Sequence, residues 1–403
     1  KILRNLSFAT AAPGPSQGYP PMRPADNELL CRVGPGTPMG NLLRRYWWPV
    51  GFSQKVTNLP VPTRILGEDL VLFRDGAGKI GLLDRSCPHR SASLENGRVE
   101  DKGLRCCYHG WLFAADGRCV DMPAEPPDTP LMKHVKARAY STQEAGGLIF
   151  GYLGPAPAPL LPAYDLLVRD DIDRVVRAGL DRCNWLQRAE NGADPCHSMA
   201  LHASVYPSIA LKRPNVVYER TWYGMRFGIK YEGGSENVFH QIMPAHTRRL
   251  GARTVDKRPA QYLHFRVPLD DYNTLTYIIE ATKTEDGKPG TLTTRGSHSL
   301  PPNTTHERID DGWWGIASRD QDRVAQESQG VIVDRSKETL ATSDQGIAMF
   351  RRMLRDGLYA IANGGDPMGV IRDAAKNRMI EFDAKKNFTD IDETYKEVKA
   401  EVG

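Results

Sequence analysis

Short apolar runs separated by glycine-containing turns dominate the first part of the chain. Residues 64–89 have the pattern of two strands joined by the turn "DGAG" (75–78), and the same style continues through residues 80–155. This pattern predicts a small antiparallel β domain. The proline-rich stretch "GPAPAPLLPAYD" (154–165) then interrupts the pattern, as is typical of a boundary between domains.

The pattern changes beyond these prolines. Residues 180–204 predict a helix that is interrupted at Pro195, and residues 215–300 alternate between apolar and polar positions as strands do. Helical periodicity returns from about residue 319. We therefore expect an α+β fold in which the second domain has a central antiparallel sheet flanked by helices.

These patterns divide the chain into three segments. Residues 1–29 are rich in Pro, Gly, Ala and Ser, which predicts a flexible N-terminal arm. Residues 30–155 form the expected small β domain, and residues 156–403 form the expected α+β domain. The strongly charged tail, residues 371–403, is interpreted as an amphipathic surface helix.

Composition and charge narrow the class of protein. Of the 403 residues 40% are hydrophobic and 25% are charged, which is ordinary for a globular protein. The formal charge of +4 gives no indication of a nucleic-acid partner. No apolar run approaches the roughly 18 residues needed to cross a membrane, and no signal peptide is apparent. Seven cysteines, an odd number, argue against a closed disulfide framework, so we expect a cytoplasmic protein.

Two cysteines and two histidines in the first domain have the spacing of metal ligands. Cys87 and His89 form C-x-H, and Cys106 and His109 form C-x-x-H. A structural zinc site is one alternative. Two loops that each offer one thiolate and one imidazole favour a Rieske [2Fe–2S] cluster, in which the cysteines bind one iron and the histidines the other. Cys107 is a rival to Cys106, but the C-x-x-H spacing favours Cys106.

A second candidate metal site lies beyond the prolines. Asp194, His197 and His202 form D-x2-H-x4-H, and two histidines with one carboxylate are the ligands of many non-haem Fe(II) oxygenases. Residues five apart point about 140° apart on a regular helix. The two histidines can share an iron only if the backbone is irregular, which Pro195 favours. Otherwise they are two unrelated histidines.

Several segments resemble the Rieske non-haem iron oxygenases. "CPHRSASLENG" (87–97) and "CYHGWLF" (107–113) resemble the two cluster loops of that family, and "CNWLQRAENGADPCHSMALH" (183–202) resembles its iron-site helix. "RVGPGTPMGNLLRRYWWPV" (32–50) and "SDQGIAMFRRML" (343–354) are similar to its phthalate 4,5-dioxygenase branch. The resemblance covers nearly all of the chain from about residue 30.

The resemblance assigns roles that the spacing alone leaves open. It implies that Asp194 is a bridging residue, which contacts an iron-bound histidine and reaches the cluster ligand His109 of a neighbouring subunit. The third iron ligand is then Asp322, which opens a predicted helix, with Asp320 and Asp334 as alternatives.

The resemblance also implies an activity. A terminal oxygenase of this family takes electrons from an NAD(P)H-dependent flavin/iron–sulfur reductase and uses O₂ to hydroxylate an aromatic substrate, often an aromatic carboxylate. It implies a homo-oligomer, a trimer or stacked trimers. Alternatives are a monooxygenase or O-demethylase of the same architecture, or a Rieske electron carrier with a binding module. The candidate cationic residues for a carboxylate are Arg213, Arg226, Arg248 and Arg249, although a surface charge is the simpler interpretation of each.

Overall fold

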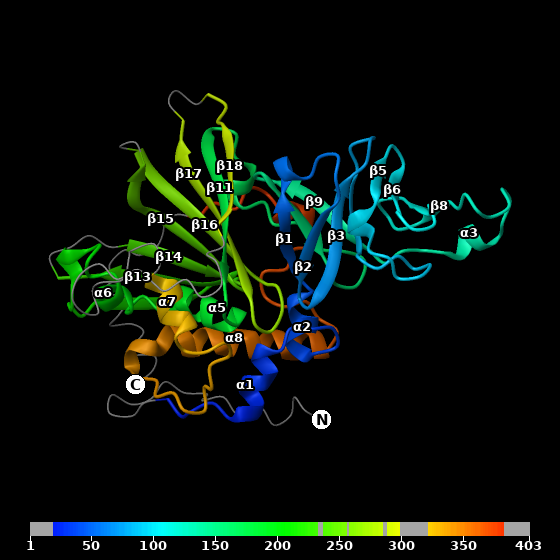
Figure 1. Ribbon diagram of the computed structural model, residues 1–403. Coiled ribbons are helices and arrows are strands. Elements are labelled where there is room, and N and C mark those ends of the chain that lie inside the picture. The colour runs from blue at the N-terminus through cyan, green and yellow to red at the C-terminus, as the bar shows by residue number, and fades with distance from the viewer. Residues whose placement is uncertain (1–18, 233–236, 256–257, 285–287, 299–320, 383–403) are drawn as a thin grey trace.

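The fold is α+β, as predicted, and three β-sheets organise it (Figure 1). The computed structural model describes residues 19–232, 237–255, 258–284, 288–298 and 321–382. Within these residues no helix has the length and apolar character that a membrane crossing requires.

The first domain contains two antiparallel sheets. A six-stranded sheet has the order β1-β10-β9-β4-β3-β2, and a four-stranded sheet has the order β5-β6-β7-β8. The strands are β1 (Trp47–Phe52), β2 (Val61–Ile65), β3 (Glu68–Arg74), β4 (Ile80–Asp84), β5 (Arg98–Glu100), β6 (Gly103–Arg105), β7 (Leu112–Phe113), β8 (Cys119–Asp121), β9 (Ala139–Ala145) and β10 (Leu148–Tyr152).

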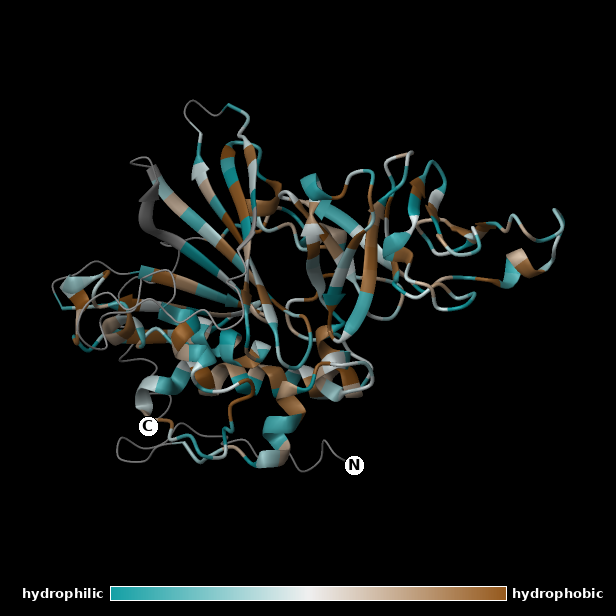
Figure 2. Cartoon of the chain, viewed as in Figure 1, coloured by the Kyte–Doolittle hydropathy of each residue, from teal (hydrophilic) through white to brown (hydrophobic). Residues whose placement is uncertain are grey.

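The second domain is built on an eight-stranded sheet with the order β12-β13-β14-β15-β16-β17-β11-β18. Its strands pair antiparallel, except that β18 runs parallel to β11. The strands are β11 (Ile172–Asp181), β12 (Asn215–Arg220), β13 (Gly224–Lys230), β14 (Asn237–Ile242), β15 (His246–Val255), β16 (Arg258–Pro268), β17 (Thr274–Lys283) and β18 (Leu292–His298). Figure 2 shows hydrophobic and hydrophilic residues alternating along several of them, as expected for strands whose two faces differ.

Helices gather below this sheet in the view of Figure 1. The α-helices are α1 (Pro24–Cys31), α2 (Pro38–Leu43), α3 (Leu131–His134), α4 (Asp165–Val168), α5 (Trp185–Ala193), α6 (Ser198–Leu201), α7 (Gln321–Glu327) and α8 (Gln345–Ala362). Short 3₁₀ turns occur at Ser53–Lys55, Leu94–Asn96, Pro207–Ile209, Thr342–Asp344 and Ala374–Lys376. Of these helices, α3 lies apart from the group, beside the small four-stranded sheet.

Two expectations about the ends of the chain need correction. Residues 24–29, assigned from composition to a flexible arm, belong to α1, because Leu29 and Leu30 are buried in the core. Residues 371–382, assigned to a surface helix, contain only the 3₁₀ turn. Their backbone instead pairs in extended conformation with the proline-rich stretch, through the bridges Leu160–Ile371 and Tyr164–Ile380. The remainders of both segments, residues 1–18 and 383–403, lie outside the described residues.

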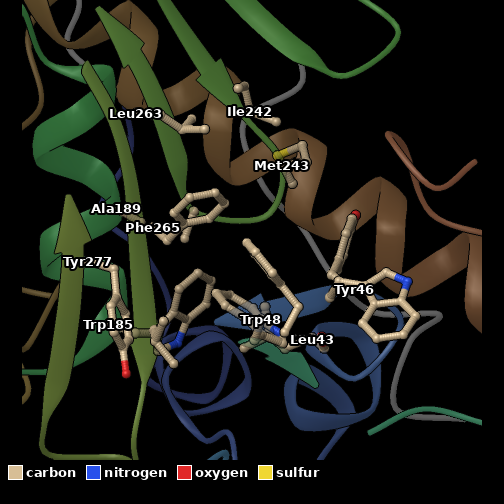
Figure 3. Close-up of a cluster of buried hydrophobic side chains, with 14 of the residues drawn as sticks. Leu43, Tyr46, Trp48, Trp185, Ala189, Ile242, Met243, Leu263, Phe265 and Tyr277 are labelled. Atoms are coloured by element: carbon tan, nitrogen blue, oxygen red, sulfur yellow. Dashed lines mark hydrogen bonds between the residues drawn. The ribbon is translucent and has the colours of Figure 1, made fainter. Parts of the chain in front are cut away.

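A continuous hydrophobic core joins the six-stranded sheet to the eight-stranded sheet (Figure 3). Trp48 of β1 and Phe265 of β16 are buried in it, and Phe265 packs against Phe150 of β10 with ring centroids 5.4 Å apart. A separate small core lies within the first domain and includes Phe73, Leu104 and Phe113. The six-stranded and eight-stranded sheets therefore share one hydrophobic core, while the four-stranded sheet has a core of its own.

Candidate metal centres

Two tight turns present the cysteines and histidines of the first domain. Cys87 and His89 follow β4, where the amide of Ser91 donates to the carbonyl of Cys87 at 2.8 Å. Cys106 and His109 follow β6, where the amide of Gly110 donates to the carbonyl of Cys106 at 3.2 Å. Gly110 has a positive φ of 75°, which this turn requires and which glycine adopts without strain. The two turns bring all four predicted cluster residues together.

The side chains of these turns face one another. Cys87 and Cys106 are both buried and in contact, and burial raises the pKa of the Cys87 thiol to about 11. The rings of His89 and His109 lie 4.5 Å apart between centroids, and His89 also stacks on Trp111 at 4.2 Å. The Nδ1 atom of His89 is buried without a hydrogen-bond partner among the described residues. Paired thiols beside an imidazole nitrogen that lacks a partner fit a [2Fe–2S] cluster.

The two adjacent cysteines, Cys106 and Cys107, differ in burial. Cys106 is 4% exposed and lies in the small core, whereas Cys107 is exposed to solvent. Only Cys106 adjoins Cys87. The geometry therefore agrees with the preference for Cys106 that the spacing gave.

The second site forms where the helix over residues 180–204 breaks. Helix α5 ends at Ala193, and the one-turn helix α6 begins only at Ser198. His197 precedes α6, and His202 follows it with φ −100° and ψ 16°, outside helical geometry. This irregularity brings the two rings within 5.2 Å of each other, which a regular helix would prevent.

Asp322, in the first turn of α7, completes the group. Its Oδ1 atom lies 3.5 Å from Nε2 of His197 and 3.4 Å from Nε2 of His202. One ligand atom from each of the three residues lies within 4.8 Å of the others. Two imidazole nitrogens and one carboxylate oxygen that converge in this way fit a mononuclear iron site. Asp320 lies outside the described residues, and Asp334 instead contacts Ser336 and Lys337.

Neighbouring residues hold the opposite nitrogen of each histidine. The Nδ1 atom of His197 lies 2.5 Å from the main-chain carbonyl oxygen of Asp194, and Nδ1 of His202 lies 2.8 Å from Oε1 of Gln321. Both rings thus turn Nε2 toward Asp322, as metal-binding histidines do when an outer partner fixes their tautomer. Asn191 donates to Oδ1 of Asp322 at 3.2 Å. No sequence pattern indicated Gln321 or Asn191, because a residue that contacts a ligand from outside needs no fixed spacing.

Electrostatics favour an ionised Asp322. Burial raises the pKa of its carboxyl, but the hydrogen bond with His202 and the charges of His197 and Arg188 outweigh burial, and the pKa lies well below its usual range.

The carboxylate of Asp194 is turned to the backbone, where Oδ1 accepts from the amides of Cys196 and His197 at 2.9 and 3.4 Å.

Two buried polar side chains of α5, Gln187 and Glu190, anchor the helix rather than the metal. Gln187 donates to the carbonyls of Gln326 and Gly330 at 3.0 and 2.9 Å, which ties α5 to α7 and the loop that follows it. Glu190 is buried between Arg335 and Arg351, at 2.7 and 2.6 Å. These contacts fix the helix whose end carries the iron-site residues.

The two sites lie on opposite sides of the molecule. Figure 1 shows β6, which leads into the second cluster turn, far from α6 and α7, which carry the histidines and Asp322.

Comparisons with known proteins agree with this geometry. Residues 46–140 match the model of the Rieske [2Fe-2S] domain. The chain is 37% identical to the 5,5'-dehydrodivanillate O-demethylase oxygenase subunit of Sphingobium sp. (strain NBRC 103272 / SYK-6), over 88% of this chain and 84% of that protein. It is 32% identical to the phthalate 4,5-dioxygenase oxygenase subunit of Pseudomonas putida, over 90% of this chain and 92% of the relative.

Solved structures share the fold. The structure of a Pseudomonas putida CBB5 NdmA mutant with caffeine has a TM-score of 0.65, at 22% identity, over 80% of this chain and 93% of that one. Identity at this level shows the fold alone, whereas the identity to the two full-length relatives shows the family. The chain belongs to the Rieske non-haem iron oxygenases, as an oxygenase subunit with a [2Fe–2S] cluster and a mononuclear iron.

Proposed function

We propose that this chain is the terminal oxygenase of a multicomponent system that hydroxylates an aromatic carboxylate with O₂. The observation that carries the proposal is the convergence of His197, His202 and Asp322, whose ligand atoms lie within 4.8 Å of one another. A Rieske electron carrier has no use for such a group. When bound, the mononuclear iron supplies activation of O₂, and the two-iron cluster supplies single electrons.

The residues of the chain divide into two sets of roles. Cys87, His89, Cys106 and His109 hold the cluster in a domain of residues 30–155. His197, His202 and Asp322 hold the iron in a domain of residues 156–403. The main-chain carbonyl of Asp194 and the side-chain oxygen of Gln321 orient the two histidines toward Asp322, where these three side chains would hold an iron that supplies the activation of oxygen.

Electron transfer between the centres requires a second copy of the chain. The two sites lie on opposite sides of one chain (Figure 1), and a head-to-tail ring places the cluster of one subunit beside the iron of the next. We propose a trimer or stacked trimers in which Asp194 bridges His197 and the His109 of a neighbouring copy. The carboxylate of Asp194 lies 3.7 Å from Nδ1 of His197, which supports one half of this bridge.

The names of the relatives support the partners and the substrate class. Both are called oxygenase subunits, so a separate component supplies the electrons; we propose an NAD(P)H-dependent flavin/iron–sulfur reductase. Phthalate and dehydrodivanillate, which those names print, are both aromatic carboxylates.

The seven cysteines, all within the described residues, form no disulfide, which supports the cytoplasm as the compartment.

Iron content and isotope labelling test the proposal. We expect about three irons per chain and a Rieske electron-spin-resonance signal on reduction. With a generic reductase, NADH and ¹⁸O₂, a dioxygenase yields product that contains two labelled atoms. About two irons per chain and no labelled product would leave only an electron carrier and contradict the proposal.

An O-demethylase is the second candidate. It is favoured by the 37% identity to the dehydrodivanillate O-demethylase subunit, which exceeds the 32% identity to the phthalate dioxygenase subunit. The same labelling experiment separates the two reactions. A methoxylated aromatic substrate that yields formaldehyde and a phenol, with no doubly labelled product, identifies the demethylase.

A further inference from the structure

One face of the eight-stranded sheet carries a row of polar side chains. Gln241 of β14 pairs directly with Thr247 of β15, which pairs with His264 of β16. Directly paired residues of antiparallel strands share a face, and Arg266, two residues beyond His264, lies on that face as well. The residues between them on β16, such as Phe265, point to the opposite face and pack in the hydrophobic core (Figure 3).

Arg266 is a buried cation that has no carboxylate partner among the described residues. It is 4% exposed, and its only hydrogen bond to them runs from Nη1 to the hydroxyl of Thr247, at 3.1 Å. Its Nε atom has no partner there. Burial lowers the pKa of Arg266 to about 9, and the charge of Arg188 adds to this effect. A buried guanidinium that lacks a carboxylate partner favours an anionic ligand.

Two other arginines nearby are neutralised within the protein, and the partly buried Arg249 lies over the ring of Phe239. Arg248, on β15, donates to both carboxylate oxygens of Asp165, at 3.2 and 2.7 Å. Arg188, on α5, pairs with Asp181 at 2.9 Å. Arg226, one of the arginines proposed from the sequence, pairs with Glu219, and Arg213 is exposed. Arg266, which the sequence pattern did not indicate, differs from Arg248, Arg188 and Arg226 because no carboxylate among the described residues accepts a hydrogen bond from it.

Gln241 is a second polar group without a partner. Its side chain is fully buried, and neither its amide nitrogen nor its oxygen has a hydrogen-bond partner among the described residues. Gln241, Thr247 and Arg266 all approach one residue, Gly192. A Cβ atom at Gly192 would lie 2.5 Å from Oε1 of Gln241, 2.7 Å from Cγ2 of Thr247 and 3.0 Å from Nη1 of Arg266.

This polar cluster adjoins the proposed iron site. Gly192 follows Asn191, whose side-chain amide donates to Asp322 and lies 3.4 Å from Nε2 of His197. The charge of Asp322 acts on Arg266 as well. Arg266 and Gln241 therefore lie near the residues that converge on the proposed iron site.

We infer that Arg266 binds the carboxylate of the substrate, with Gln241 donating a hydrogen bond to the same group. The inference rests on the proposed function and names the recognition residues of its substrate class. A planar guanidinium suits a carboxylate because two parallel N–H groups can meet its two oxygens. Thr247 holds Nη1 and so fixes the plane of the guanidinium.

Binding of matched ligand pairs to the holoenzyme, without reductase, tests this inference. The pairs are phthalate with phthalamide, and 3-methoxybenzoate with 3-methoxybenzamide, measured by calorimetry. We expect the wild type to bind the carboxylate of at least one pair roughly 10- to 100-fold more tightly than its amide. Arg266→Gln should remove this preference, and Arg266→Lys should retain part of it because the charge remains.

Arg248→Gln is the matched control, since it replaces a buried arginine of the neighbouring strand on the opposite face. It should keep the preference for carboxylates. The cluster signal and the unfolding midpoint of each variant show whether it is folded. A wild type without preference in either pair, or an Arg266→Gln variant that retains it, overturns the inference. Loss of mononuclear iron or of labelled product instead contradicts the proposed function, so the two failures are distinguishable.

Discussion

Nδ1 of His202 lies 2.8 Å from the side-chain oxygen of Gln321, the residue that begins α7 and directly precedes Asp322. One helix start thus supplies both the carboxylate that faces Nε2 of His202 and the amide that holds its other nitrogen. Gln321 is itself fixed, because its amide nitrogen donates to the hydroxyl of Ser204 at 3.0 Å.

Removal of this outer contact should weaken metal binding. Gln321→Ala leaves the three proposed ligands in place but frees the ring of His202, so we expect iron affinity to fall about 10- to 100-fold. Dialysis against a graded series of chelator concentrations measures the change. Gln329→Ala, at an exposed position after the same helix, is the control. Equal iron retention in both variants would show that His202 needs no such support.

Asp322→Ala should abolish turnover and lower iron from about three to about two per chain, since the cluster stays bound. Metal analysis and the spin-resonance signal of the cluster measure the two centres separately. The matched variant is Asp334→Ala, whose carboxylate is 47% exposed and contacts only local residues. Full iron occupancy in Asp322→Ala would point to another carboxylate.

Asp194→Asn should separate electron transfer from metal binding. The main-chain carbonyl, rather than the carboxylate, holds Nδ1 of His197, and an asparagine oxygen can still accept from the amides of Cys196 and His197. Both metals should therefore stay bound, while loss of the charge slows electron transfer between subunits. Rapid mixing of the reduced protein with O₂ and substrate measures the reoxidation of the cluster. An unchanged rate would exclude the proposed bridge.

Glu190→Gln should destabilise the second domain. Glu190 is buried and pairs with Arg335 and Arg351. Arg351 also pairs with Glu338, but loss of Glu190 leaves the buried guanidinium of Arg335 without a carboxylate partner among the described residues. We expect a cost of about 3–5 kcal/mol in the free energy of unfolding, measured by denaturant titration. Asp366→Asn removes a partly exposed partner of Arg372 and should cost less than about 1 kcal/mol. Similar costs for the two variants would contradict this account.

The sequence predicted those features whose residues stand close together along the chain. The four candidate cluster residues lie in two short turns, and their spacing indicated a cluster. The spacing of His197 and His202, which flank α6, left open that they were unrelated, and the family resemblance selected them. Asp322 is distant in sequence, and only the family resemblance selected it. The α+β fold followed from the change between strand and helix periodicity, whereas composition misjudged residues 24–29 because two buried leucines decide their structure.

The residues that could not be predicted from the sequence were missed for physical reasons. Gln321 and Asn191 act through contacts between distant segments, which leave no periodic signal. Arg266 stands in an alternating strand, where a polar position usually indicates a face in contact with water. Here α5 approaches that face at Gly192, so the same alternation marks a buried polar surface.

The alternation along β16 has a consequence for substitutions in that strand. Positions 263, 265 and 267 hold the two large sheets together, while positions 264 and 266 look toward the proposed ligand. Substitutions at position 266 should therefore change the preference for ligands, whereas substitutions at position 265 should loosen the packing between the two large sheets.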